Sequence, residues 1–238
     1  MTKSNTLELI GKYPILDLVS KCYKELKKDS NGRDQSWEHC YNAFQNTFQN
    51  RGKDPDIDNL SLHLGFYLAS WGMMRGSTGL FWKDYKVHTE IVKILVDSDY
   101  ETIRCTVEYN FDQENLELIF ENLVEKINNA YSKQDYFKSG NDKPDKIHPT
   151  ETLISKVLLG TLCCVPAYDT NLKCALKKIE IIQTFNKNSL SQIFEFLLQG
   201  ENLESLKWAQ KEVNQDGKNY PLMRIVDMYL WEVAAKVN

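Results

Sequence analysis

Apolar residues recur along nearly the whole chain at the three- and four-residue spacing of amphipathic helices. One such helix is expected from Leu16 to Leu26 and a second from Trp37 to Phe48, with turn-prone residues 29–32 between them. Alternation typical of strands never continues beyond about five residues, and no repeat of solenoid period is present. The pattern predicts an all-α fold of about ten helices, without a sheet of three or more strands.

A long third helix is expected in the middle of the fold. It should begin after Pro55, with Asp54 or Asp56 as its cap, and continue to Met74. Because it is apolar on almost every side, we expect other elements to surround it. Further helical patterns cover 80–95, 100–107 and 113–131, and later helices should start at Pro149 or Thr150, Asp169 or Thr170, Asn188 or Ser189, Glu201 and Pro221.

Residues 132–149 interrupt the helical pattern. The segment is polar, contains Gly140, Pro144 and Pro149, and shows no periodicity. It is the candidate boundary if the chain folds as two helical lobes with a cleft between them. Otherwise residues 1–238 are a single all-helical domain of ordinary size.

Composition excludes several classes of protein. Apolar residues make up 42% of the chain and charged residues 26%, as in ordinary globular proteins, and no apolar stretch is long enough to cross a membrane. The first residues contain no apolar signal segment, so we expect a cytoplasmic protein with no membrane partner. The six cysteines are scattered and the four histidines form no HxxxH or HExxH pattern. Reduced core cysteines, no metal and no cofactor are therefore expected.

Charge is unevenly distributed along the chain. The segment 97–126 contains nine acidic and two basic residues, a net charge of −7, so that the remainder carries +3 of the overall −4. Such segregation allows one face to be acidic while another meets a polyanion such as DNA. The alternative is that both faces are ordinary solvated surface.

The segment 152–171 holds the most informative polar residues. Lys156 lies in an otherwise apolar helix, one turn before Gly160, which would allow a ligand or a second backbone to approach closely. Asp169 follows a proline-fixed turn at Pro166, where its carboxylate either caps the next helix or points into the space beside the turn. A lysine that only extends to solvent and an aspartate that only caps are the structural alternatives.

The sequence Pro-Ala-Tyr-Asp-Thr-Asn-Leu at 166–172, after a helix and a tight turn, resembles the element that carries the catalytic aspartate in DNA glycosylases of the helix-hairpin-helix superfamily. The resemblance covers about twenty residues and implies a two-lobed helical enzyme that flips a damaged or modified base out of double-stranded DNA. It implies that Asp169 supports cleavage of the N-glycosidic bond and that Lys156 is a candidate nucleophile. Segments 64–77 and 221–231 are also similar to a widespread family of uncharacterised bacterial proteins and to glycosylases of anti-phage defence.

A second candidate site lies at the junction after the central helix. Arg75, Gly76 and Ser77 stand in a glycine-rich segment where backbone N–H groups and a guanidinium could bind a phosphate. No GK[ST] sequence follows, which excludes a Walker A loop. Glycines that simply end one helix and begin another are the alternative.

Further residues complete the DNA-binding hypothesis. Lys173 and Lys177 are candidate phosphate contacts, whereas the candidates for the base pocket are His63, Tyr67, Trp71 and Tyr168. Core packing is the stronger explanation for the aromatic residues, because a central helix of an all-α protein needs them in any case. In the last helix, Arg224 and Asp227 have the spacing of an internal ion pair.

The sequence therefore leaves three hypotheses open. The first is a DNA glycosylase that uses no cofactor and excises a damaged or modified base. The second is a non-catalytic helical interaction module of a defence or toxin–antitoxin system. The third is a small-molecule or nucleotide binder that uses the loop around Arg75.

Overall fold

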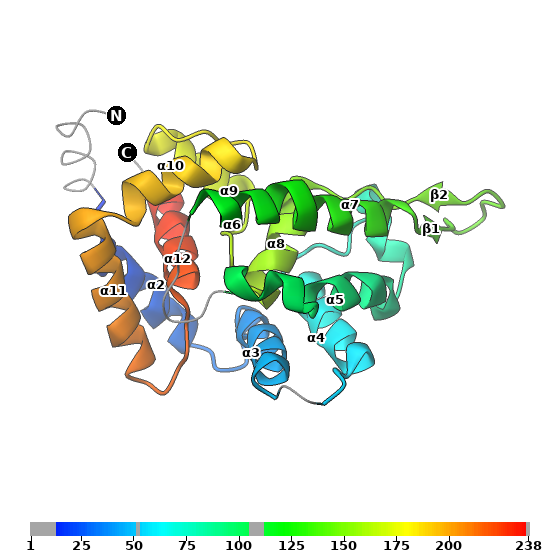
Figure 1. Cartoon of the computed structure of the whole chain (residues 1–238), viewed down its shortest axis with the longest axis horizontal. Coiled ribbons are helices and arrows are strands. Elements are labelled where there is room, and N and C mark those ends of the chain that lie inside the picture. Colours follow the sequence, from blue (N-terminus) through cyan, green and yellow to red (C-terminus); the bar gives the residue numbers. More distant parts are fainter. Residues whose placement is uncertain (1–12, 51–52, 105–111, 237–238) are drawn as a thin grey trace.

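The computed structural model describes residues 13–50, 53–104 and 112–236. Within these ranges 67% of the residues are helical, and the strands form one two-stranded hairpin with two residues in each strand. The predicted all-α fold is confirmed (Figure 1). No helix in the described part of the chain combines the length and the apolar character that a membrane crossing requires.

The α-helices and strands have the following bounds: α2 Ile15–Lys27, α3 Gln35–Gln49, α4 Ile57–Ser70, α5 Thr89–Leu95, α6 Gln113–Glu117, α7 Val124–Ser132, β1 Asp135–Tyr136, β2 Asp145–Lys146, α8 Glu151–Thr161, α9 Thr170–Lys178, α10 Lys187–Leu197, α11 Gly200–Asn214 and α12 Leu222–Ala235. A π-helical segment, Leu118–Leu123, joins α6 to α7. Short 3-10 helices occupy much of the chain between α4 and α6.

Local chemistry explains where the central helix α4 begins and ends. The Asp56 side chain accepts a hydrogen bond from the backbone N–H of Asn59 at 3.0 Å, which confirms Asp56 as the cap. The helix ends at Ser70 rather than near Met74. Gly72 adopts a left-handed φ of +70°, and the N–H of Met73 donates to the carbonyl of Leu68 at 2.8 Å. This Gly72 turn closes the helix and directs the chain away from its axis.

Further predicted boundaries differ from the structure. The segment 80–95 forms the 3-10 helices Leu80–Trp82 and Tyr85–His88 before α5, because Asp84 caps a new turn through the N–H of Lys86 at 2.9 Å. The cap of α10 is Asn186, which accepts from the N–H of Ser189 at 2.9 Å, rather than Asn188 or Ser189. The pattern predicted over 100–107 continues into residues 105–111, outside the described ranges.

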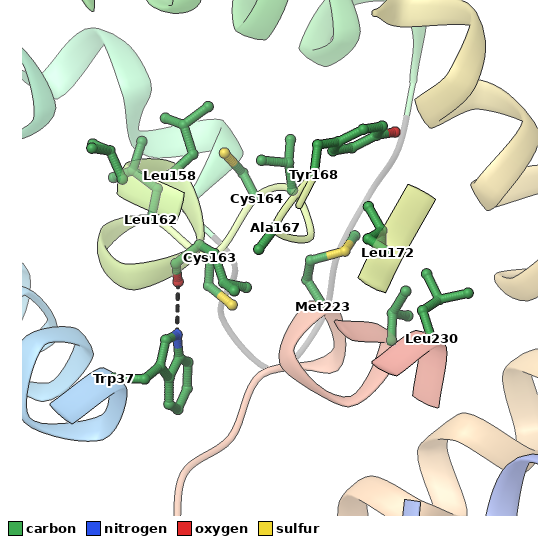
Figure 2. Packing of buried hydrophobic residues seen from close by; sticks show 14 of the residues in the cluster. Trp37, Leu158, Leu162, Cys163, Cys164, Ala167, Tyr168, Leu172, Met223 and Leu230 are labelled. Carbon is green, nitrogen blue, oxygen red and sulfur yellow. Dashed lines mark hydrogen bonds between the residues drawn. The ribbon is translucent and has the colours of Figure 1, made fainter. Parts of the chain in front are cut away.

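Helix α8 lies inside the fold. It packs against α3, α4 and α7, and all nine of its residues from 153 to 161 are buried. The chain then turns sharply, and Figure 2 shows this turn between α8 and the residues Met223 and Leu230 of α12. The indole N–H of Trp37 donates to the Leu159 carbonyl at 3.0 Å, the dashed line in Figure 2. Residues 153–168, which include most of this turn, are all buried.

Residues 132–149 include the hairpin of β1 and β2, which projects beyond the helices in Figure 1. The strands are antiparallel, with Asp135 opposite Lys146. Among the described residues, buried hydrophobic side chains before and after this segment belong to one core cluster. The described cysteines form no disulfide with one another, and they are buried except for Cys174.

Gly160 lies where α8 meets α4 most closely. A Cβ atom placed on Gly160 would lie 2.3 Å from a ring carbon of Tyr67, well inside van der Waals contact. The missing side chain therefore makes room for the Tyr67 ring rather than for a ligand, and this contact fixes the distance between the two helices.

We expect Gly160→Ala to lower the free energy of unfolding by about 1–3 kcal/mol, because the overpacking outweighs the higher helix propensity of alanine. Urea denaturation measures the change. Gly76→Ala is the matched control: a Cβ there has nothing within 4 Å, so stability should stay within about 0.5 kcal/mol. A stabilised Gly160→Ala protein would contradict the described packing.

Candidate functional site

A cavity of about 360 Å³ lies between α2, the C-terminal end of α4, α8, the start of α9 and α12. This volume falls in the range of roughly 300–1,000 Å³ that small-molecule sites occupy. Its wall includes several charged and aromatic side chains. Among them are Trp71, Lys156, Asp169, Arg224, Asp227 and Trp231.

Lys156 does not extend to solvent. Its exposed fraction is 5%, and its Nζ lies 3.5 Å from Oδ2 of Asp169 and donates to the backbone carbonyl of Trp71 at 3.2 Å. The same Nζ lies 5.4 Å from the centre of the Trp71 ring. Burial lowers the pKa of Lys156 below its ordinary value, and the negative charge of Asp169 opposes this shift. The amine consequently releases a proton more readily than a lysine in water.

Asp169 combines the two roles that the sequence left as alternatives. Its Oδ1 accepts hydrogen bonds from the N–H groups of Asn171 at 3.0 Å and Leu172 at 3.1 Å, which caps α9. Its Oδ2 faces Lys156 at the wall of the cavity. One carboxylate thus anchors the helix with one oxygen and pairs with Lys156 at the cavity wall through the other.

The turn that carries Asp169 is held by α12. The N–H of Ala167 donates to Oδ1 of Asp227 at 3.0 Å, while Oδ2 of Asp227 accepts from Nη1 of Arg224 at 2.6 Å. Burial raises the pKa of Asp227, and the charge of Arg224 opposes this effect. The predicted internal ion pair of Arg224 and Asp227 is confirmed, and it also forms part of the cavity wall.

The guanidinium of Arg224 joins two aromatic side chains from other helices. Its Cζ lies 4.7 Å from the ring centre of Trp37 on α3 and 5.4 Å from that of Trp71 at the end of α4. No pattern in the sequence indicates that these groups line a cavity. The sequence indicates only that these residues share one face of a helix, since Arg224, Asp227, Met228 and Trp231 have the corresponding spacing.

Of the four residues expected in a base pocket, the structure places one in the cavity. Trp71 lines it, whereas Tyr67 is fully buried behind the surface and its ring lies 5.3 Å from that of Trp71. Tyr168 is a core residue whose hydroxyl bonds Ser189 at 2.9 Å. His63 lines a different cavity, of about 470 Å³, between α3 and α4. Tyr168 and His63 are therefore separate from the Lys156–Asp169 pair.

The predicted phosphate loop does not line the cavity, but the charge of Arg75 acts on Lys156, which does. Arg75, Gly76 and Ser77 are exposed, and the Nε of Arg75 donates to the carbonyl of Gly72. The positive charge of Arg75 contributes to lowering the pKa of Lys156. An anion held by Arg75 would consequently lie near the cavity.

The two lysines predicted on α9 have different environments. Lys173 forms a 2.7 Å ion pair with Glu151 at the start of α8, so its charge is already matched. Lys177 is exposed on the following turn. Of the two, Lys177 is the cation more readily available to a phosphate.

In the described ranges, no group of three or more His, Cys, Asp or Glu side chains has the arrangement of a metal site. The functional groups that line the cavity include carboxylates, an amine, two guanidinium groups and two indoles.

Comparison with known proteins adds no identification. No protein-family model matches the chain, and no curated protein or solved structure is significantly similar to it. A functional argument for this protein therefore rests on the geometry of the cavity.

We expect Asp169→Ala to lower the free energy of unfolding by about 1 kcal/mol, because it removes both hydrogen bonds of the α9 cap. Asp169→Asn keeps a capping oxygen and should change stability much less. Chemical denaturation of the two variants provides the comparison. Equal losses in both variants would show that the cap contributes little and that the charge of Asp169 dominates its effect on stability.

Proposed function

We propose that the protein cleaves the N-glycosidic bond of a nucleotide in DNA and releases the base. The observation that carries the proposal is the Lys156–Asp169 pair, 3.5 Å apart, at the wall of a cavity that also presents Trp71 and Asp227. This arrangement provides negative charge, an amine with a lowered pKa and an aromatic ring within one site. The resemblance of residues 166–172 to a glycosylase element supports the same reaction.

Asp169 is suited to stabilise the reacting sugar. Cleavage of the glycosidic bond builds positive charge on the sugar ring, and a fixed carboxylate lowers the energy of that state. The capping bonds of Oδ1 hold the side chain in place, so that Oδ2 needs no reorganisation when the charge develops. The effect is larger at the wall of this cavity than in bulk water, because the surrounding core lowers the local dielectric constant.

Lys156 is suited to proton transfer rather than to attack on the sugar. Its Nζ is already held by the Asp169 carboxylate and the Trp71 carbonyl, whereas its lowered pKa favours donation of a proton to the departing base. The bond between C1′ and the base nitrogen breaks, and its electron pair leaves on that nitrogen. A water oxygen forms the new bond to C1′. The proton that this water loses passes to Asp169 and from there to Lys156, where it replaces the proton that Lys156 gave to the base.

The aromatic residues and cations fit a flipped nucleotide. Trp71 and Trp231 supply indole surface on which a base can stack, and Trp231 is 47% exposed. Arg75 and Lys177 are exposed cations that suit the phosphates beside that nucleotide. Double-stranded DNA with a damaged or modified base is thus the proposed partner.

A second candidate function is a helical interaction module. The observation in its favour is a set of large apolar side chains with exposed fractions of 58–61%, namely Phe66, Phe81, Phe137 and Trp208. Such residues suit a protein partner. This alternative assigns no role to the cavity, so variants of the cavity would leave partner binding unchanged.

We expect Asp169→Asn to abolish base release while the protein stays folded and continues to bind DNA. The amide keeps the shape and the cap but lacks the charge that stabilises the cationic sugar. The assay incubates the protein with duplexes that carry a panel of damaged and phage-type modified bases and measures abasic sites.

The control for this experiment is Cys174→Ser, a conservative change at an exposed residue that does not line the cavity. It should release base at the wild-type rate. If the wild-type protein releases no base from any duplex of the panel, the proposed activity is wrong and the interaction module is favoured.

We expect Arg75→Ala to weaken DNA binding and to reduce the slope of log affinity against log salt by about 1, because one phosphate contact is lost. Fluorescence anisotropy at several salt concentrations measures both quantities. Lys207→Ala removes an exposed cation of α11 that does not line the cavity and should leave the slope unchanged. Binding that is independent of salt in the wild-type protein would contradict the phosphate contact.

A further inference from the structure

Two aromatic rings are exposed on the 3-10 helix Leu80–Trp82, next to the β hairpin. Phe81 and Trp82 are 61% and 38% exposed, and their ring centres are 5.1 Å apart with the ring planes nearly perpendicular. Leu80, the first residue of the same helix, is buried and fixes the turn to the core. The two rings do not line the cavity, so the proposed base release assigns them no role.

The β hairpin is fixed to this segment. The Tyr136 ring packs directly on Gly79, where a Cβ atom would lie 2.4 Å from a ring carbon. Nζ of Lys83 donates to the backbone carbonyl of Asp135 at 3.1 Å. The projecting hairpin of Figure 1 and the 3-10 helix that carries the aromatic pair therefore lie side by side.

Lysine side chains meet at Asp135, close to the aromatic pair. Nζ of Lys146 lies 2.7 Å from the carboxylate of Asp135 and donates to the carbonyl of Lys133 at 3.2 Å. Lys83, which directly follows Trp82, bonds the backbone carbonyl of the same aspartate. Two ammonium groups therefore lie at one aspartate, whose single charge balances only one of them.

Positive charge exceeds negative charge over this part of the molecule. Residues 79–88 and 132–148 contain six lysines and four aspartates, a net charge of +2 in a chain of net charge −4. The aliphatic side chains Leu80, Val87 and Ile147 of these segments are buried, and the large hydrophobic side chains that are exposed are aromatic. Exposed rings beside an excess of lysines suit a polyanion that carries flat rings of its own better than an aliphatic protein surface.

We propose that this aromatic–lysine surface, formed by Phe81, Trp82, Lys83 and Lys146, binds single-stranded nucleic acid. Unpaired bases can stack on the exposed rings, and the two ammonium groups supply charge for the adjoining phosphates. The bases of a duplex are already stacked on one another and offer no free face to these rings. None of the four residues lines the cavity, so this inference does not depend on the proposed base release.

The test measures the binding of a fluorescein-labelled thymidine oligonucleotide of about twelve nucleotides, a length that such surfaces contact. Fluorescence anisotropy with the full-length protein should show an affinity that falls as salt rises. We expect Trp82→Leu to lower this affinity at least about fivefold, the lower end of the loss for one base–aromatic stack. The same variant should bind an unmodified duplex as the wild-type protein does, and Trp82→Phe, which keeps a ring, should retain most of the affinity for the single strand.

Two further variants test the other parts of the surface. Phe81→Ala should also lower the affinity at least about fivefold, and because this ring is mostly exposed the variant should stay folded. Lys146→Ala should reduce the slope of log affinity against log salt by about 0.7, the value for one phosphate contact with a single strand.

Trp208→Ala and Lys211→Ala are the matched controls. Trp208 on α11 is 59% exposed, and Nζ of Lys211 lies 5.5 Å from its ring centre, but neither residue belongs to the aromatic–lysine surface. Both variants should bind the oligonucleotide with wild-type affinity. Unchanged affinity in both Trp82→Leu and Phe81→Ala would overturn the assignment. An absence of oligonucleotide binding at low salt would also overturn it and would favour a protein partner for the exposed rings.

The outcomes also separate this inference from the proposed activity. Asp169→Asn should bind the oligonucleotide with wild-type affinity, because Asp169 lies outside the surface. Ring-dependent binding of the single strand, without release of a base from any duplex, would overturn the activity and leave the surface in place. Base release together with oligonucleotide binding that does not depend on the two rings would overturn the surface and leave the activity in place.

Discussion

The buried ion pair of Arg224 and Asp227 connects the parts of the fold that form the cavity. Removing these charges from water costs several kcal/mol per ion, and this cost is offset only if nearly every polar atom finds a partner. Asp227 meets this condition through Arg224 and the N–H of Ala167, and Arg224 also lies against the rings of Trp37 and Trp71. Helix α12 therefore sets the position of α3, of the end of α4 and of the turn before α9.

The cavity is built from ordinary main-chain features at the ends of helices. Gly72 ends α4 directly after Trp71, and the capping bonds of Asp169 begin α9. Lys156, in contrast, comes from the middle of α8, whose residues 153–161 are all buried. A lysine at this position remains compatible with folding because Asp169 and the Trp71 carbonyl replace part of its lost hydration. The proposed activity and the stability of the fold consequently depend on the same contacts.

The sequence predicted those features that depend on neighbouring residues. The cap at Asp56, the cap at Asp169 and the pair at Arg224 and Asp227 follow from spacing along a single helix. It could not predict that Trp71, Lys156 and Asp227 meet, because their contacts join helices far apart in the chain. It also assigned Tyr67 and Tyr168 to a pocket, since aromatic residues in a core and in a binding site have the same local pattern.

The direction of α9 has an electrostatic consequence for the cavity. Its N-terminus begins at Asp169, so the aligned peptide dipoles of this helix place partial positive charge beside that carboxylate. This positive potential does not depend on whether Lys156 holds a proton. If the amine gives its proton to a departing group, Asp169 would still face the positive end of a helix, and its negative charge would not be left without compensation.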